Sequence, residues 1–302
     1  MSKLKVFYTD KYRVPLPEGH RFPMKKYRLT REYLLADNIL NESELYEPDI
    51  ATADEILLCH SEDYYESFRT GSIDEKAIRK LGLPWSYDLF LRSLASVGGS
   101  LASAKSAFEN GVAGNLSGGT HHAFKEHGEG YCVFNDFAIV STYLQKNNLA
   151  KNIAIIDLDV HQGNGTSSIL KDNTNVFILD MHGEKNYPYE KIPSTLDVRL
   201  PDNTNDEHYL SILENKLEVI FDFEPDIVLY LAGVDPLRED ALGRLALTKA
   251  GLRERDYMVL NECKKRNIPV SIALGGGYAK PIELTVECYA QTYEVVKEVF
   301  SF

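Results

Sequence analysis

Cysteine is scarce in this sequence, and its spacing excludes two common uses of thiols. The four cysteines are Cys59, Cys132, Cys263 and Cys288, and no two of them form a CxxC pair. A zinc–thiolate cluster or a disulfide framework requires cysteines that are closely spaced or paired in a recognisable pattern. We therefore expect reduced thiols and a reducing compartment, the cytoplasm.

Long apolar stretches and linkers are also missing. Residues Met1 to Tyr8 contain no apolar run of the kind that a signal peptide or membrane anchor needs. The 302 residues include no low-complexity tract, internal repeat or Ser/Pro/Gly-rich segment that would divide the chain. Because 44% of the residues are hydrophobic, the chain can bury a substantial core, and we expect one domain over residues 1–302.

Positive charge is in deficit. The chain has 33 Lys and Arg residues against 45 Asp and Glu residues, which gives a net charge of −12. This balance argues against nucleic acid as a general partner. It favours cationic substrates, such as lysine-containing peptides or polyamines.

Short apolar runs alternate with helix-like segments along the chain. We expect strands at Lys151–Val160, Val176–Asp180, Asp226–Val234 and Pro269–Leu274, and helices at Phe90–Asn110, Asn205–Phe221 and Thr248–Arg266, with Thr248 as an N-cap. The alternation predicts an α/β fold with a central, mainly parallel sheet and helices on both faces. Tyr12–Lys26 predicts an irregular loop, whose Pro17–Phe22 segment either borders a site or is ordinary surface.

Two carboxylates and a histidine interrupt the apolar run from Ile155 to Gly165. On a strand, Asp157, Asp159 and His161 would share one face. Burial of unpaired carboxylates is costly, and a divalent cation removes that cost. The glycines that follow predict a loop at the carboxyl end of the strand, where open α/β sheets place their chemistry.

Asp235 is a second candidate ligand, because it follows the apolar run from Ile227 to Val234. Taken alone, Asp235 fits a helix N-cap equally well. Together with Asp159 and His161 it would leave the fourth position of a tetrahedral zinc open, as in catalytic sites.

Adjacent histidines, His121 and His122, follow a glycine pair. Asp157 and Asn164 are available as their partners. A carboxylate stabilises an imidazolium whereas an amide only orients the ring, so we expect the two histidines to titrate apart. In isolation, the pair fits a surface metal site as well as a catalytic role.

Tyr278 follows a glycine triplet at the end of the last predicted strand. A phenol in that position can donate a hydrogen bond to an oxyanion. Packing is the alternative, since the chain contains 18 tyrosines.

In combination these motifs resemble the arginase/deacetylase superfamily, and within it the zinc-dependent histone deacetylases and their bacterial relatives. The resemblance spans nearly the whole chain and is carried, in the family's order, by Gly118–His122, Gly130–Asp136, Asp157–Gly165, Ala232–Asp235 and Gly275–Tyr278. Gln162–Gly165, the short chain and Pro17–Phe22 are most similar to the class IV branch. The resemblance implies a single-domain arginase/deacetylase fold and removal of an acetyl or longer fatty acyl group from lysine.

The resemblance also implies the role of each site residue. Asp159, His161 and Asp235 would hold zinc or, in the cell, ferrous iron. His122, oriented by Asn164, would be the general base and then the general acid. His121, paired with Asp157, would give electrostatic support, and Tyr278 would stabilise the oxyanion. Gly130 would accept the substrate amide N–H, between the tunnel walls Tyr131 and Tyr187.

A potassium ion near the zinc is implied as well, with Asp157 and Asp180 among its ligands. Asp180 stands where some relatives carry a smaller hydroxyl residue, and Asn164 stands where several eukaryotic classes have aspartate. The asparagine should lower the basicity of His122 without abolishing its role.

Alternatives remain open. A deacylase of small molecules such as acetylpolyamines would use the same chemistry, and a narrow entrance lined by acidic groups would favour it. A non-catalytic acyl or metal sensor would keep the fold without turnover, and a ureohydrolase would need two manganese ions. We expect neither nucleic acid nor membrane as a partner, and the sequence leaves the oligomeric state and the acyl length open.

Overall fold

A single parallel sheet organises the chain. The computed structural model describes residues 3–12 and 14–302, so Met1, Ser2 and the loop residue Arg13 lie outside the described residues. Within the described residues the sheet has eight strands in the order β2-β1-β3-β8-β7-β4-β5-β6, and every neighbouring pair is parallel. The strands are β1 (Val6–Phe7), β2 (Leu45–Tyr46), β3 (Val112–Asn115), β4 (Ile153–Asp157), β5 (Val176–Gly183), β6 (Leu196–Leu200), β7 (Ile227–Leu231) and β8 (Val270–Ala273).

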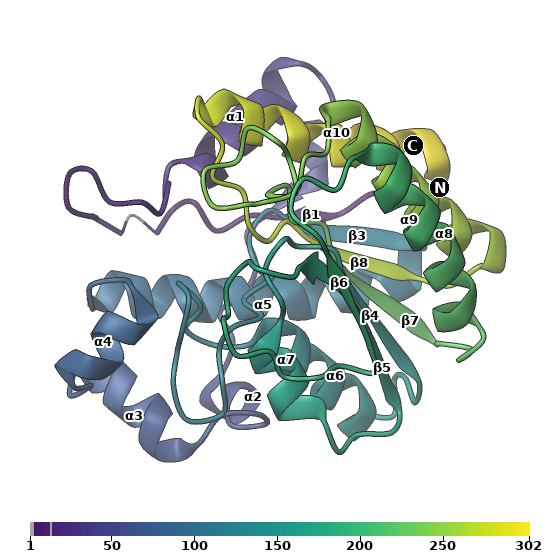
Figure 1. The fold of residues 1–302 in the computed structure, drawn as a ribbon. Coiled ribbons are helices and arrows are strands. Elements are labelled where there is room, and N and C mark those ends of the chain that lie inside the picture. The colour runs from purple at the N-terminus through teal and green to yellow at the C-terminus, as the bar shows by residue number, and fades with distance from the viewer. Residues whose placement is uncertain (1–2, 13) are drawn as a thin grey trace.

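Helices cover both faces of the sheet, as the sequence predicted (Figure 1). The α-helices are α1 (Lys26–Ala36), α2 (Ala53–Ile56), α3 (Glu62–Thr70), α4 (Glu75–Leu81), α5 (Tyr87–Asn110), α6 (Asp136–Lys146), α7 (Asn164–Leu170), α8 (Asp206–Phe221), α9 (Lys249–Arg266) and α10 (Ile282–Phe300), and a 3-10 turn spans Glu42–Glu44. In Figure 1, α1, α8, α9 and α10 lie on one side of the sheet, and α5, α6 and α7 lie on the other with α2 to α4 beyond them.

The side chains of the central strands alternate between two cores. Ala154 and Ile156 of β4 pack into the core beneath α8 to α10, whereas Ile153 and Ile155 pack into the core beneath α5 and α6. This period of two is what a strand buried on both faces requires. The sheet is therefore packed against helices on both faces, and this packing sets the positions from which the loops at its carboxyl edge begin.

The predicted helices form with small differences at their ends. Thr248 is the N-cap of α9, because its hydroxyl accepts a hydrogen bond from the Gly251 N–H at 3.1 Å. Asn205 caps α8 in the same way. The helix predicted from Phe90 instead begins at Tyr87, because Ser86 accepts the Leu89 N–H and so sets an earlier start.

The strand predicted as Lys151–Val160 ends at Asp157, so the prediction that Asp159 and His161 share a strand face was wrong. Beyond Asp157, backbone N–H groups donate hydrogen bonds to side-chain carboxylates. The Val160 N–H donates to Asp235 Oδ1 at 2.8 Å, and the His161 N–H donates to Asp159 Oδ1 at 2.9 Å. Carboxylate oxygens thus replace the carbonyl oxygens of a neighbouring strand as acceptors, and the chain leaves the sheet after Asp157.

Three other predicted strands also have shifted ends: β5 continues to Gly183, β7 covers Ile227–Leu231 and β8 covers Val270–Ala273. All four cysteines are free and buried. Within residues 3–12 and 14–302, none of the helices combines the length and apolar character that crossing a bilayer requires.

Candidate functional site

The candidate residues gather at the carboxyl edge of five strands that are neighbours in the sheet, in the order β3-β8-β7-β4-β5. Each connection that leaves this edge contributes at least one of them. They are His121, His122, Gly130 and Tyr131 between β3 and α6; Tyr278 after β8; Asp235 after β7; Asp157, Asp159, His161 and Asn164 at the end of β4 and the start of α7; and Asp180 and Tyr187 in and after β5.

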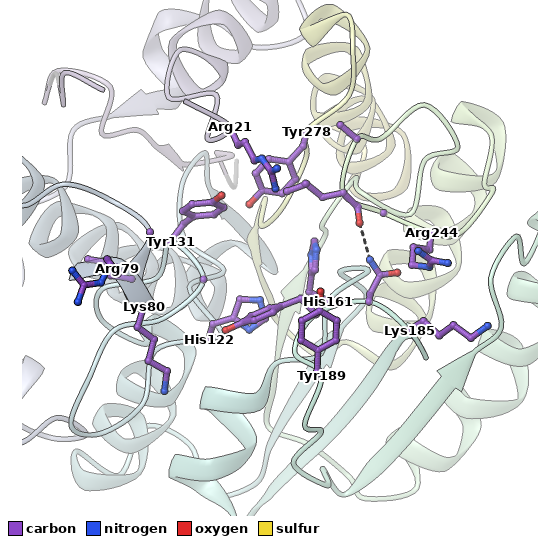
Figure 2. A pocket seen from close by; sticks show the side chains of 18 residues that line it. Arg21, Arg79, Lys80, His122, Tyr131, His161, Lys185, Tyr189, Arg244 and Tyr278 are labelled. Atoms are coloured by element: carbon purple, nitrogen blue, oxygen red, sulfur yellow. Dashed lines mark hydrogen bonds between the residues drawn. The ribbon is translucent and has the colours of Figure 1, made fainter. Parts of the chain in front are cut away.

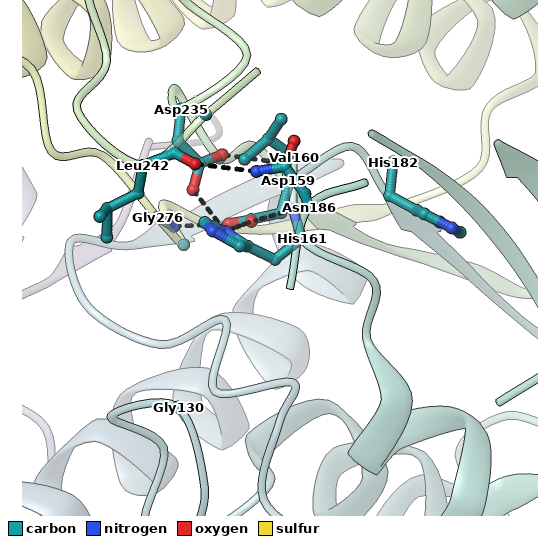
Figure 3. Close-up of polar contacts among 12 residues, drawn as sticks. Gly130, Asp159, Val160, His161, His182, Asn186, Asp235, Leu242 and Gly276 are labelled. Carbon is teal, nitrogen blue, oxygen red and sulfur yellow. Dashed lines mark hydrogen bonds and ion pairs between the residues drawn. The ribbon is translucent and has the colours of Figure 1, made fainter. Parts of the chain in front are cut away.

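Three buried side chains, Asp159, His161 and Asp235, form one compact cluster (Figure 3). We call these three residues the metal group. One ligand atom from each residue lies within 4.8 Å of the others. His161 Nδ1 is 3.0 Å from Asp159 Oδ1 and 3.1 Å from Asp235 Oδ2. The helix-cap alternative for Asp235 was wrong, because turns and not a helix follow it, and its carboxylate serves Val160 and His161 instead.

The electrostatics of this group fit a divalent cation. Burial and the neighbouring Asp159 charge raise the pKa of Asp235 to about 7. Burial alone would lower the pKa of His161, but hydrogen bonds to Asp159 and Asp235 outweigh it and raise that pKa to about 10. A divalent cation among these atoms would keep both carboxylates ionised and the imidazole neutral. Two oxygens and one nitrogen are also a ligand set that zinc accepts.

Glycines leave room at the same point. A Cβ on Gly276 would lie 2.0 Å from Asp235 Oδ2 and 2.7 Å from Asp159 Oδ2, and a Cβ on Gly233 would lie 2.5 Å from Asp159 Oδ2. The Gly276 N–H also donates to Asp159 Oδ2 at 2.7 Å. Any larger residue would therefore displace the ligand oxygens.

The two histidines lie beside the metal group with the partners expected from the sequence. His121 Nδ1 is 2.8 Å from Asp157 Oδ2, and His122 Nδ1 is 2.7 Å from Asn164 Oδ1. The two rings are 4.2 Å apart between centroids. Because the amide oxygen of Asn164 only accepts, His122 Nδ1 carries a proton and Nε2 keeps its lone pair.

Their pKa values shift in opposite directions. Burial acts to lower the pKa of His121, yet the charges of Asp157 and Asp159 raise it to about 9. Burial and the charges of His121 and His161 hold the pKa of His122 well below its usual value. At neutral pH His121 is therefore a cation and His122 is a free base.

Tyr278 and Tyr131 border the space above the metal group. A small inner cavity of about 50 Å³ is lined by Asp159, His161 and both adjacent histidines. It shares five lining residues with an entrance cavity of about 520 Å³, whose lining is drawn in Figure 2. Both tyrosines line both cavities. Burial raises the pKa of Tyr278 well above its usual value, so the phenol remains a hydrogen-bond donor.

Gly130 and Tyr187 also line the entrance cavity. The Tyr187 ring is 5.0 Å from the His122 ring, and its hydroxyl donates to Glu129. Gly130 has a φ of +53°, and a Cβ there would lie 2.6 Å from His122 Cδ2. Its carbonyl accepts a weak hydrogen bond from Cys132 Sγ at 3.4 Å. The substrate-facing roles of these residues stay predictions.

Asp180 lies beside Asp157, because the two residues are register partners on β5 and β4. Both oxygens of Asp180 have partners: the Gly163 N–H donates to Oδ2 at 2.8 Å, and His182 Nδ1 is 2.7 Å from Oδ1. Two adjacent buried carboxylates suit a monovalent cation, although these contacts already engage the Asp180 oxygens. The potassium site stays a prediction.

The segment Pro17–Phe22 borders the site rather than ordinary surface. The Phe22 ring is 5.1 Å from the Tyr131 ring and 6.3 Å from the Tyr278 ring, and His20 Nε2 is 3.0 Å from the Gly82 carbonyl oxygen. As predicted, the chain is irregular here, and α1 starts only at Lys26.

Sequence reasoning missed Lys26, which is fully buried. Its Nζ donates to the carbonyl oxygens of Gly275 and Gly277 and to the Tyr289 hydroxyl, and lies 4.9 Å above the Tyr278 ring. Lys26 thus braces the glycine triplet that carries Tyr278. Nothing in the pair Lys25-Lys26 distinguishes a buried lysine from an exposed one.

Sequence reasoning also missed Arg255 on α9 and Asp240. Arg255 is fully buried and donates to the carbonyl oxygens of Leu158 and Gly233, the residues next to two metal-site segments. Asp240 accepts the Tyr278 N–H at 2.6 Å. An arginine among the many charged residues of α9 gives no signal of burial by itself.

Comparison with known proteins gives consistent matches. The model of the histone deacetylase domain matches residues 20–295. An uncharacterized protein of Picosynechococcus sp. is 42% identical over 296 residues, which cover 98% of this chain and 99% of the relative. Histone deacetylase 2 of Arabidopsis thaliana is 31% identical, over 93% of this chain and 76% of the relative. The crystal structure of an HDAC homologue complexed with SAHA superposes with a TM-score of 0.84 at 29% identity, covering 99% of this chain and 84% of that one.

Replacement of Gly276 tests the metal group. Gly276→Ala places a methyl group against the ligand oxygens of Asp159 and Asp235, so we expect zinc affinity to fall by at least about tenfold. Competition with a chromogenic chelator measures that affinity. Gly111→Ala is the control, because its Cβ meets only Phe300, at 3.6 Å, and its positive φ strains the backbone without touching the site. Equal zinc affinity in Gly276→Ala and the unchanged protein would contradict the assignment.

Proposed function

This chain belongs to the histone deacetylase family, and from that premise we propose that it hydrolyses the amide bond of N-acylated lysine in proteins or peptides. One observation supports this function most strongly: three metal-ligand atoms lie within 4.8 Å of one another beside a buried histidine that is neutral at pH 7. An amidohydrolase needs both a Lewis acid and a base at the same carbon.

Zinc is the ion that we propose for Asp159, His161 and Asp235, with ferrous iron as the alternative in the cell. When bound, the ion supplies Lewis acidity to the acyl carbonyl and makes the attacking water more acidic. The protein contributes the placement of the ligands. The carboxylates of Asp159 and Asp235 accept hydrogen bonds from backbone N–H groups. Arg255 donates to one backbone carbonyl oxygen in each of the two segments that carry them.

His122 is the proposed general base. Its Nε2 takes the proton of the attacking water and then gives it to the departing lysine nitrogen. Asn164 keeps the ring in the required tautomer through the 2.7 Å contact at Nδ1. His121 stays protonated against Asp157, and its charge opposes accumulation of a second positive charge on His122. This opposition makes His122 a ready donor in the second half of the reaction.

Tyr278 is the proposed donor to the oxyanion that develops on the acyl carbonyl. Its phenol stays protonated because it is buried, and Lys26 and Asp240 hold the loop that carries it. Gly130 would accept the substrate amide N–H, and Tyr131 and Tyr187 would flank the lysine stem. We also propose a structural potassium ion near Asp157 and Asp180, which would offset two adjacent buried charges.

A polyamine deacylase is the second candidate, and the lining of the entrance disfavours it. Among the described residues that line the entrance cavity there is no carboxylate, whereas a polyamine substrate would be helped by acidic groups. The sensor alternative is disfavoured because each proposed catalytic group has its expected partner. A ureohydrolase with two manganese ions would need a second ligand cluster, and only one was found in the described part of the chain. We propose the cytoplasm as the compartment.

The inner cavity bears on acyl length. A volume of about 50 Å³ holds on the order of four groups the size of a water molecule. An acetyl group fits this space, and a fatty acyl chain would require the surrounding side chains to move. We therefore propose that short acyl groups are preferred.

A series of acyl-lysine peptides from acetyl to myristoyl tests both the activity and the cavity. We expect the zinc-loaded protein to give its highest kcat/KM with acetyl, and a decline of at least about tenfold by octanoyl, since each misplaced methylene costs on the order of 1 kcal/mol. His122→Ala should lower kcat by a factor of at least about 10². No cleavage of any acyl-lysine would refute the proposed function, and a maximum at myristoyl would refute only the acyl-length proposal.

The partner of His122 generates a prediction about pH. Asn164→Asp would place a carboxylate 2.7 Å from Nδ1, which stabilises the imidazolium and raises the pKa of His122 by about 1 unit or more. Because the base must be neutral, the acidic limb of the kcat/KM profile should move to higher pH by the same amount. The matched variant Asn164→Ala should lose rate without that displacement. Superimposable profiles for Asn164→Asp and the unchanged protein would contradict the role of Asn164.

A further inference from the structure

The mouth of the entrance cavity is ringed by positive charge. Its lining includes Arg21, Arg79, Lys80, Lys185 and Arg244, and among the described residues that line it there is no aspartate or glutamate. Figure 2 shows these five side chains distributed around the opening, with His122 and His161 at its floor. We call these five residues the cationic rim.

Four separate segments build the cationic rim. Arg21 precedes α1, Arg79 and Lys80 belong to the last turn of α4, Lys185 follows β5, and Arg244 lies between β7 and α9. All five residues are exposed. A single charged helix face would be an ordinary solvated surface, but convergence from four segments onto one opening requires the folded chain.

Some of this charge is neutralised locally and some is not. Lys80 pairs with Glu129, and Arg79 pairs with Glu75. Lys185 and Arg244 share the single carboxylate of Asp202. For Arg21 no ion pair forms with any residue that the structure describes.

Three carboxylates therefore face five cations, and the carboxylates lie outside the cavity lining. The side chains of Arg79, Lys185 and Arg244 remain 70%, 67% and 51% exposed despite their pairs, so they stay available to a ligand.

The rim is opposite in sign to the protein as a whole. The chain carries a net charge of −12, so its overall charge repels anions. A cleft lined by charge of one sign focuses the electric field, and such focusing can change association rates by 10-fold or more. A substrate with positive charge near its acyl-lysine would gain no electrostatic attraction from this opening.

We propose that this site selects acyl-lysine within a protein or peptide segment whose neighbouring residues are acidic. The inference rests on the proposed function. Acylation neutralises the lysine nitrogen, so the residues that flank it determine the charge presented to the rim. Extended residues advance by about 3.3 Å each, which places the side chains one to three positions from the acyl-lysine around the mouth. Aspartate or glutamate at these positions would meet arginine and lysine on every side.

Three peptides of one length test the preference, each with a central acetyl-lysine flanked on both sides by two aspartates, two serines or two lysines. We expect kcat/KM to fall in that order, with at least about a tenfold difference between the acidic and basic peptides at low ionic strength. Because the rim acts on association, the ratio should shrink as sodium chloride is raised to about 0.5 M. Equal kcat/KM values for the three peptides would overturn the proposal.

Replacing rim cations with carboxylates tests whether the cationic rim causes the preference for the acidic peptide. The double variant Arg21→Glu/Arg244→Glu should lose the preference for the acidic peptide. Lys146→Glu/Lys171→Glu is the matched control, because it changes net charge equally on exposed residues that precede the amino ends of β4 and β5, at the opposite edge of the sheet. Retention of the preference in the rim variant, or its loss in the control, would contradict the assignment to the rim.

A binding measurement separates this proposal from the proposed function. Fluorescence anisotropy with the His122→Ala variant reports the affinity for the three labelled peptides without turnover. Tighter binding of the acidic peptide would support the rim proposal even if the unchanged protein cleaves no acyl-lysine. Equal affinities would overturn the rim proposal while leaving the hydrolytic activity to its own test.

Discussion

Two carboxylates and one histidine are buried together where β4 and β7 end, and the electrostatic cost of that burial governs the rest of the site. Asp159 and Asp235 each lose nearly all contact with water. Backbone N–H groups of Val160, His161 and Gly276 offset part of this cost. A divalent cation would offset the remainder, because two charges of one sign at this separation oppose each other strongly in a low dielectric. The metal group is therefore the point from which the other site residues take their positions and charges.

Layers of positioning residues surround this group. Arg255 and Asp256 form a buried ion pair, and Arg255 also binds the carbonyl oxygens of Leu158 and Gly233 beneath the metal group. Lys26 and Tyr289 hold the glycine triplet from the other side. Outside these layers, the histidine pair, Tyr278 and the two cavities provide a route from solvent, and the cationic rim surrounds its mouth. Carboxylates therefore lie at the centre, and cationic side chains surround them from Lys26 and Arg255 outward to the rim.

Local residue patterns predicted the α/β class, four of the eight strands of the described sheet, three of the ten described α-helices, and the residues that gather at the candidate site. The run around Asp157, Asp159 and His161 was informative because buried strands rarely contain carboxylates, and the capping residue Thr248 marked its helix correctly. The end of β4 was placed too late, because side-chain acceptors such as Asp235 come from a segment about 75 residues away. The burial of Lys26 and Arg255 and the convergence of the cationic rim also depend on tertiary packing. Composition pointed toward cationic substrates, whereas the local charge at the mouth points the other way.

Metal stoichiometry tests the central claim most directly. Purified protein would be stripped of metal, equilibrated separately with excess zinc and excess manganese, desalted, and analysed by inductively coupled plasma mass spectrometry beside an Asp235→Asn variant. A single site formed by Asp159, His161 and Asp235 predicts about one zinc ion per chain, lost in the variant. Two manganese ions per chain, or zinc retained at full stoichiometry by Asp235→Asn, would contradict the account.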